Sequence, residues 1–173
     1  MFKNLVLFFS LFFSCLLSAQ TSYRNFSAEN WTVNKQNDPQ KYKAKIPGTV
    51  HTDLFQNKVI PDPFFGANKK KMQWVENENW EYETYFSVTP SELKNENIDL
   101  EFDGLDTYAT VYLNGKVISE ADNMFRKWII PTKSLLKKEN NHLKIVFHSA
   151  VQKGKDEAKI ISYTLPEKER VFV

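Results

Sequence analysis

Apolar and polar residues alternate along most of the chain from residue 80 onwards. Apolar side chains recur at every second position in four segments, 80–88, 98–102, 109–113 and 143–147. Since successive side chains of a β-strand point to opposite faces of a sheet, this period of two predicts strands with one buried face. Asn114-Gly115 directly follows the third segment. Both residues tolerate positive φ, so we expect a hairpin there, with a return strand from Val117.

The chain before residue 80 is less regular. Residues 20–46 are polar with scattered aromatic side chains, which predicts an extended lead-in with one or two edge strands. Thr49 suits a helix N-cap, and Val50 and Leu54 share one helical face, so a single short helix is expected near residue 52. The segment 60–66 contains two prolines and a glycine and should form a stiff surface loop. Many short strands with one short helix predict an all-β domain of the β-sandwich type.

Residues 1–19 do not share this pattern. A lysine precedes the apolar run LVLFFSLFFSCLL, and small residues end at Ala19. This layout predicts a secretory signal peptide that is cleaved after Ala19, and therefore a secreted or periplasmic protein. The alternative of a membrane anchor is disfavoured, because the run is too short to span a bilayer comfortably. The alternative of a lipoprotein modified at Cys15 is disfavoured by the bulky Phe13 just before Ser14.

Composition limits the function further. The chain has 173 residues and a formal net charge of +2, which fits one domain and gives no reason to expect nucleic acid or an anionic membrane as partner. Cys15 is the only cysteine, so the cleaved protein would have neither disulfides nor thiolate metal sites. The three histidines lack metal-ligand spacing, so no metal is expected. No cofactor is expected either, because the sequence has no glycine-rich phosphate loop.

The stretch ENENWEYETY, residues 76–85, places four carboxylates around a tryptophan, as a sugar-cleaving site would. Glu81 and Glu83 share one strand face, with Cα atoms expected roughly 6.6–6.8 Å apart. A retaining glycosidase holds two carboxyl groups about 5–5.5 Å apart, and it also needs one of them protonated in an apolar pocket and the other ionised. Neighbours on one strand face share nearly one environment. We therefore expect two solvated, ionised carboxylates and no catalytic residue in the chain.

Several short blocks together resemble one known family. They are IPGTVHTDL (46–54), IPDPFFG (60–66), QWVE (73–76), WEY (80–82), FDGLDTYA (102–109), VYLNG (111–115) and DNMF (122–125). In this order they are similar to the N-terminal domain of the β-mannosidases of glycoside hydrolase family 2, from about residue 31 to residue 173. The resemblance implies a jelly-roll β-sandwich of the galactose-binding-like kind over residues 20–173.

The resemblance also implies an activity that lies elsewhere. In the family this sandwich precedes an immunoglobulin-like domain and a (β/α)8 barrel, whose two glutamates remove non-reducing-end β-mannose with retention of configuration. The sequence given contains neither domain, nor the Gly-Trp-Asp-Trp-Gly-Pro-like segment of the mannose pocket. The expectation is an N-terminal portion that is inactive by itself. Its expected partners are a β-mannoside or mannan-derived oligosaccharide and the missing C-terminal domains of the same enzyme.

The resemblance finally points to residues that could approach the sugar. Sandwich loops can wall the pocket of the barrel, and Trp74, Asn77 and Asn79 are the candidates, because sugars are recognised by aromatic stacking and amide hydrogen bonds. Ordinary packing between domains would explain the same residues. Two other functions stay open: a free-standing carbohydrate-binding module, which needs an exposed aromatic platform, and a non-functional remnant with an exposed apolar surface.

Overall fold

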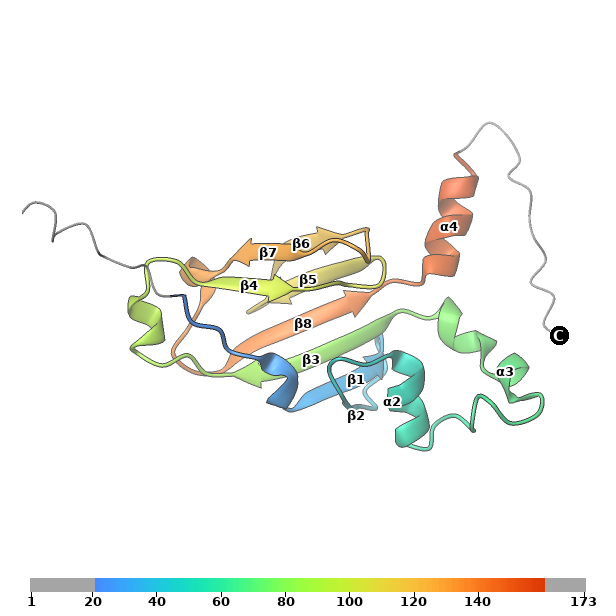
Figure 1. Ribbon diagram of the computed structural model, residues 1–173. Coiled ribbons are helices and arrows are strands. Elements are labelled where there is room, and N and C mark those ends of the chain that lie inside the picture. Colours follow the sequence, from blue (N-terminus) through green and yellow to red (C-terminus); the bar gives the residue numbers. More distant parts are fainter. Residues whose placement is uncertain (1–20, 161–173) are drawn as a thin grey trace, which may run out of the picture.

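The computed structural model describes residues 21–160 (Figure 1). The signal peptide expected at 1–19 and the alternative lipid site at Cys15 lie outside the described residues, as do residues 161–173. Within the described part of the chain, no helix has the length and apolar character that crossing a membrane requires.

The described chain is mostly short strands. In sequence order these are β1 (Trp31–Lys35), β2 (Tyr42–Ala44), β3 (Trp80–Phe86), β4 (Asp99–Phe102), β5 (Ala109–Leu113), β6 (Lys116–Ala121), β7 (Trp128–Pro131) and β8 (Asn141–Phe147). The α-helices are α2 (Val50–Gln56), α3 (Asn68–Lys71) and α4 (Ala150–Ala158). The 3-10 helices are η1 (Phe26–Ala28), η2 (Gln73–Asn77), η3 (Glu92–Lys94) and η4 (Lys133–Leu135).

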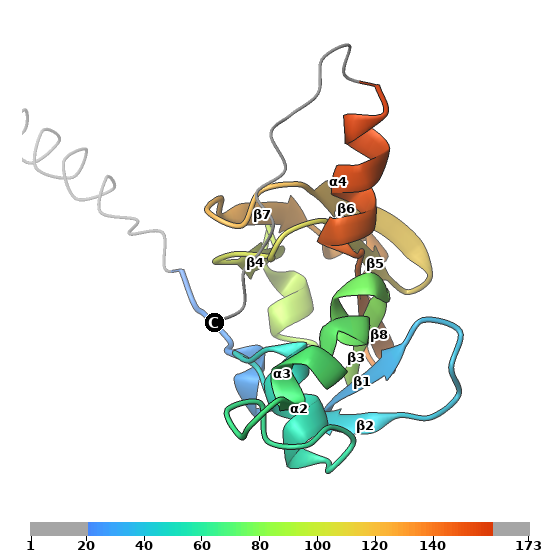
Figure 2. The ribbon, with the colours of Figure 1, turned by 90° about the vertical axis from the view of Figure 1, so that its right-hand side faces the viewer.

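The strands form two layers. Six antiparallel strands make one sheet in the order β2-β1-β3-β8-β5-β6, and β4 pairs with β7 in a second, smaller sheet. Figure 2 shows that the β4–β7 pair and α2 lie on the same side of the six-stranded sheet, which we call its inner face. The core lies between these layers, and its most buried large side chains include Val33, Leu54, Val111, Leu113 and Leu143. The arrangement confirms the predicted β-sandwich.

The sequence pattern correctly located most of these elements. In β3, Trp80, Tyr82 and Phe86 are buried, whereas Tyr85 on the opposite face is 60% exposed. The expected hairpin joins β5 to β6, with φ of 52° at Asn114 and 82° at Gly115. Both are left-handed values, which asparagine and glycine adopt more readily than other residues.

The predicted short helix is α2, and its N-cap is Thr49, as expected. The Thr49 hydroxyl accepts a hydrogen bond from the backbone N of Thr52 at 3.2 Å, and the Thr52 hydroxyl accepts one from the backbone N of Thr49 at 3.1 Å. This reciprocal pair satisfies two backbone donors that the first turn of a helix leaves free. Leu54 then anchors the helix in the core, where its side chain is fully buried.

The pattern did not predict β7, α3 and α4. β7 has only four residues and ends in Pro131, which an edge strand tolerates but which hides the alternation. α4 contains Gly154 and buries none of its nine residues, so it lacks the apolar stripe by which a helix is recognised. It begins at Ser149, whose hydroxyl caps the backbone N of Gln152 at 3.1 Å.

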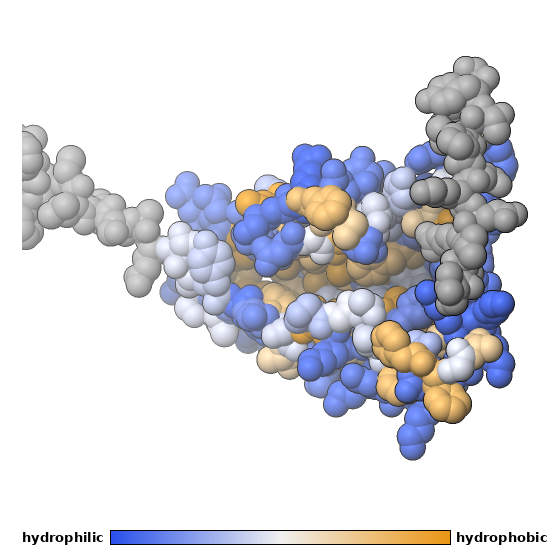
Figure 3. Space-filling model, turned by 45° about the vertical axis from the view of Figure 1, so that its right-hand side comes forward, coloured by the Kyte–Doolittle hydropathy of each residue, from blue (hydrophilic) through white to orange (hydrophobic). Residues whose placement is uncertain are grey.

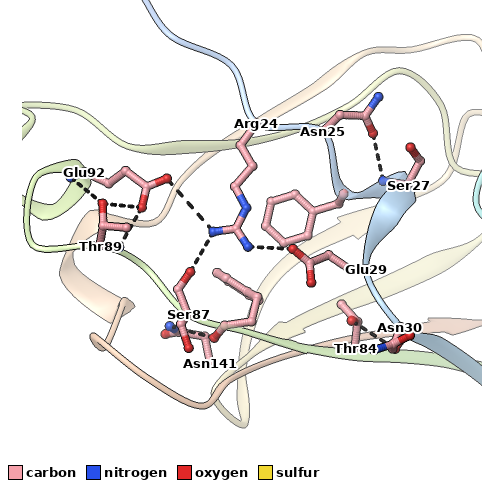
Figure 4. A network of polar contacts seen from close by, with 12 residues as sticks. Arg24, Asn25, Ser27, Glu29, Asn30, Thr84, Ser87, Thr89, Glu92 and Asn141 are labelled. Atoms are coloured by element: carbon pink, nitrogen blue, oxygen red, sulfur yellow. Dashed lines mark hydrogen bonds and ion pairs between the residues drawn. The ribbon is translucent and has the colours of Figure 1, made fainter.

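The lead-in before β1 is fastened to the sandwich by Arg24 (Figure 4). The Arg24 guanidinium donates a hydrogen bond to the carbonyl of Ser87 at 2.7 Å and pairs with the Glu29 carboxylate. It also lies 4.0 Å from the carboxylate of Glu92, which belongs to η3. These contacts tie residues 24–29 to the segment that follows β3, so the lead-in is part of the domain.

Candidate functional site

Glu81 and Glu83 of β3 lie on the outer face of the six-stranded sheet, away from α2. The Oε1 atom of Glu83 lies 3.0 Å from Lys41 Nζ, and its Oε2 atom lies 2.8 Å from His142 Nε2. The Oε1 atom of Glu81 lies 3.6 Å from Lys144 Nζ. Each carboxylate therefore faces basic side chains from a neighbouring segment, β8 or the residue before β2.

The expectation that both carboxylates are solvated is wrong, because the side chain of Glu81 is only 14% exposed and that of Glu83 only 8%. His142 of β8 and Lys41 both lie against the Glu83 carboxylate, and the His142 ring is stacked on Tyr85, its register partner in β3, with centroids 4.6 Å apart. Burial alone would raise the pKa of Glu83. The hydrogen bonds and charges of Lys41 and His142 outweigh burial and hold that pKa below its ordinary value, so the carboxylate is ionised at neutral pH.

Glu81 and Glu83 do not have the unequal surroundings that sugar cleavage requires. Neither lies in an apolar pocket and both contact basic groups, so nothing in the structure keeps one protonated while the other is ionised. The geometry supports a structural role instead, in which ion pairs hold β3 against β8 and against the segment that leads into β2.

The Glu83 ion pairs give a prediction about pH. Changing Glu83 to Gln should lower the free energy of unfolding by about 1–2 kcal/mol near pH 6, because charge-assisted hydrogen bonds to a buried carboxylate are lost. The pKa of Glu83 is lower in the folded state than in the unfolded state. The contribution of Glu83 to the free energy of unfolding is therefore complete above the unfolded-state pKa of about 4.3, and it is lost as the pH falls through the folded-state pKa. Urea unfolding at pH 6 and pH 3.5 should show the difference shrinking at the lower pH.

The control for this prediction is Glu101→Gln, which removes an exposed carboxylate that pairs with Lys127 at 2.6 Å. A pair in solvent contributes about 0–1 kcal/mol, so this variant should change stability little at either pH. An equal loss in both variants, or a Glu83→Gln loss that does not shrink at pH 3.5, would contradict the assignment.

A more deeply buried acid, Asp53 of α2, was not singled out from the sequence. It is 1% exposed, its Oδ2 atom accepts a hydrogen bond from the Tyr82 hydroxyl at 2.9 Å, and its Oδ1 atom accepts one from the backbone N of Lys45 at 3.1 Å. Burial raises the pKa of Asp53, although both hydrogen bonds oppose the rise. Burial, and then the nearby Asp53 charge, raises the pKa of Tyr82 in turn.

Asp53 is a structural residue as well. Both of its oxygens are occupied and it is closed to solvent, so no substrate can reach it. The pair fastens α2 onto β3. The sequence contains one local signal for the burial of Asp53. At helical spacing, the face of α2 that turns towards the sheet carries Val50, Asp53, Leu54 and, at the helix end, Asn57.

Trp74, Asn77 and Asn79 lie together on the segment that enters β3. Trp74 is in η2, and its ring is 40% exposed and lies against Trp80 with centroids 5.9 Å apart. The Asn77 amide donates to the carbonyl of Gln73 at 3.0 Å. The Asn79 amide is also used within the domain, since it donates to Gln36 Oε1 at 2.9 Å and accepts from the backbone N of Ser149 at 2.8 Å. Trp74 is the aromatic residue of the three, and it is exposed at the surface.

Within residues 21–160, no three His, Cys, Asp or Glu side chains come together so that they could hold a metal ion.

These features define a class: an antiparallel β-sandwich domain in which Glu81, Glu83 and Asp53 serve the fold. A family model described as the glycosyl hydrolase 2 galactose-binding domain-like family matches residues 31–173. The chain belongs to this family.

Relatives within the family share a name. The chain is 40% identical over 129 residues to β-mannosidase B of Thermothelomyces thermophilus, covering 73% of this chain and 15% of that protein. It is 32% identical over 167 residues to the β-mannosidase of Mus musculus, covering 96% and 19%. The crystal structure of β-D-mannosidase from Dictyoglomus thermophilum matches with a TM-score of 0.76 and 42% identity over 79% of this chain and 17% of that one. The chain thus spans less than a fifth of the length of each of these relatives.

Proposed function

We propose that the chain is the N-terminal domain of a longer, exported β-mannosidase that hydrolyses terminal non-reducing β-D-mannose residues in β-mannosides. In this proposal the catalytic acids belong to the polypeptide that follows, and the sandwich supports the catalytic barrel. The apolar run ahead of Ala19 supports export.

One observation carries the proposal. The matched region of the D. thermophilum β-D-mannosidase is 42% identical and superimposes with a TM-score of 0.76, yet it is 17% of that enzyme. Such a similarity indicates a shared place in a larger enzyme. The paired surroundings of Glu81 and Glu83 agree with a domain that does not cleave sugars itself.

Trp74 is the residue through which the domain would shape the outer sugar pocket. Its ring is partly exposed and is held by Trp80, which donates from its indole nitrogen to the Val75 carbonyl at 3.0 Å. Asn77 and Asn79 complete the proposed wall mainly by holding this segment in place, because their amides are hydrogen-bonded within the domain.

A domain exchange tests the proposal. Residues 21–173 would replace the matching segment of the D. thermophilum β-D-mannosidase, and hydrolysis of an aryl β-mannoside would be measured. We expect the chimera to keep activity within about tenfold of the parent enzyme, and Trp74→Ala in the chimera to raise KM more than it lowers kcat. A folded chimera without activity would contradict the proposal.

A further inference from the structure

We infer that one end of the sandwich, centred on Phe64 and Phe65, is the surface on which the next domain of the longer enzyme docks. This inference rests on the proposed function. The loop end, as we call it, is the end where β3 begins and β8 ends, and it carries the α2–α3 loop, η2, the β6–β7 loop and α4 (Figures 1 and 2).

Large exposed apolar side chains gather at the loop end. Phe64 is 97% exposed, Phe65 75%, Phe125 of the β6–β7 loop 88% and Trp74 of η2 40%. Figure 3 shows hydrophobic side chains grouped over the α2–α3 segment. Exposed apolar patches of this kind commonly mark sites where a protein binds another protein or a ligand.

The opposite end provides an internal comparison. Its loops are 87–98, 114–115 and 132–140, and none of them contributes a large exposed hydrophobic side chain to the described structure. They are rich in Lys, Glu, Asn and Ser. The lead-in at this end exposes one aromatic side chain, Tyr23, which is 84% exposed. The two ends therefore differ in how many large aromatic side chains they expose, as expected if protein covers the loop end.

The loop that carries Phe64 and Phe65 is built to hold them outward. Asp62 Oδ1 accepts a hydrogen bond from the backbone N of Phe64 at 2.9 Å. The Asp62 carbonyl accepts from the backbone N of Phe65 at 3.3 Å and from the side-chain amide of Asn68 at 3.0 Å. Prolines on both sides of Asp62 restrict the backbone further. A loop that is already ordered loses little conformational entropy when it binds.

The path of the chain indicates that the polypeptide of the next domain covers the loop end. Ser149, which begins α4, donates from its hydroxyl to the Glu76 carbonyl at 2.6 Å and from its backbone N to Asn79 Oδ1 at 2.8 Å. The chain thus leaves the sandwich beside η2, at the loop end. In the relatives more than four fifths of the protein lies outside the matched region. The point at which the chain leaves β8 therefore lies beside η2, the 3-10 helix that carries Trp74.

The chemistry of the surface favours protein over a glycan as its main occupant. Phe64, Phe65 and Phe125 have no polar group that could bond a hydroxyl, whereas sugar sites combine an aromatic face with several convergent polar groups. The amide of Asn79 is occupied within the domain at both its nitrogen and its oxygen, and the Asn77 nitrogen donates to the Gln73 carbonyl.

The test compares Phe64→Ser/Phe65→Ser with Val117→Ser/Ile129→Ser in the chimera and in the chain alone. Val117 and Ile129 are 55% and 59% exposed on strands, away from the α2–α3 loop. In the chain alone both variants should keep their unfolding temperature within about 2 °C, because exposed side chains add little to stability. In the chimera the Phe64→Ser/Phe65→Ser variant should lower the unfolding temperature by roughly 5 °C or more, and the control should not.

Equal unfolding temperatures for the two variants in the chimera would overturn the inference. A second contrary result would be mannan binding by the chain alone that is lost in the Phe64→Ser/Phe65→Ser variant, because the surface would then be a glycan-binding platform. If the chimera does not fold, the same comparison can be made by calorimetric titration, which measures binding of the chain to the D. thermophilum enzyme that lacks its matched segment. Binding should weaken at least tenfold in the Phe variant and not in the control, and equal binding overturns the inference. Failure of the proposed function has a separate readout, because it shows as an inactive wild-type chimera.

Discussion

Asn141→Ala should lower the free energy of unfolding by about 3–4 kcal/mol, a large share of the 5–15 kcal/mol that stabilises a typical domain. Asn141 is the first residue of β8, and its side chain is fully buried. Its amide nitrogen donates to the carbonyls of Lys137 at 2.6 Å and Phe86 at 3.3 Å. Its Oδ1 atom accepts from the backbone N of Lys137 at 2.8 Å and from the Asn114 amide at 3.1 Å.

The size of this effect comes from the groups that alanine leaves behind. The carbonyl of Phe86 and the backbone groups of Lys137 would lose their partner in a place with little access to water, and each unsatisfied buried group costs about 1–3 kcal/mol. The same side chain joins the end of β3, the start of β8 and the β5–β6 turn, so its loss loosens three elements at once.

Urea unfolding measures this effect, with Asn97→Ala as the matched control. Asn97 is exposed in the loop before β4, and its side chain has no hydrogen-bond partner among residues 21–160, so its replacement should change stability by less than about 0.5 kcal/mol. A loss below about 1 kcal/mol for Asn141→Ala would contradict the role assigned to the network.

The elements that the sequence predicted are those with local causes. The alternation of β3, the Asn114-Gly115 turn and the Thr49 cap each depend on a few neighbouring residues, and the structure confirms them. The expected loop at 60–66 is confirmed as well, since it forms turns without helix or strand. The sequence pattern did not predict β7, because β7 is short and ends in proline. It did not predict α4, because α4 has no buried residue.

The parts that could not be predicted depend on contacts between distant residues. Glu83 is buried because His142, 59 positions along the chain, bonds to it. Asp53 is buried because Tyr82, 29 positions away, supplies a hydroxyl. A local pattern marks both acids simply as polar, and only the strand register and the placement of α2 decide which acid the fold encloses.

The candidate site divides in the same way. The similar surroundings of Glu81 and Glu83 could be argued from their shared strand face, although the burial of these two carboxylates could not. The placement of Trp74, Asn77 and Asn79 on one segment follows from their closeness in sequence. That Asn79 binds Ser149 and Gln36 depends on where α4 and the β1–β2 loop fold.

The second large effect concerns activity. A glycosidase accelerates bond cleavage roughly 10⁶-fold or more by holding one proton-donating and one ionised carboxyl beside the sugar. Glu81 and Glu83 both face basic groups, and Asp53 is enclosed with both oxygens bonded. These three acids therefore offer no pair with divided roles, and we expect the chain's own rate on an aryl β-mannoside to be that of buffer.

The most direct measurement is release of an aryl leaving group from an aryl β-mannoside by the purified chain at neutral pH, beside the active chimera and a Glu81→Gln/Glu83→Gln variant. We expect the chain and the variant both to match the buffer blank while the chimera turns over. Turnover by the chain clearly above the blank that disappears in the double variant would contradict the account.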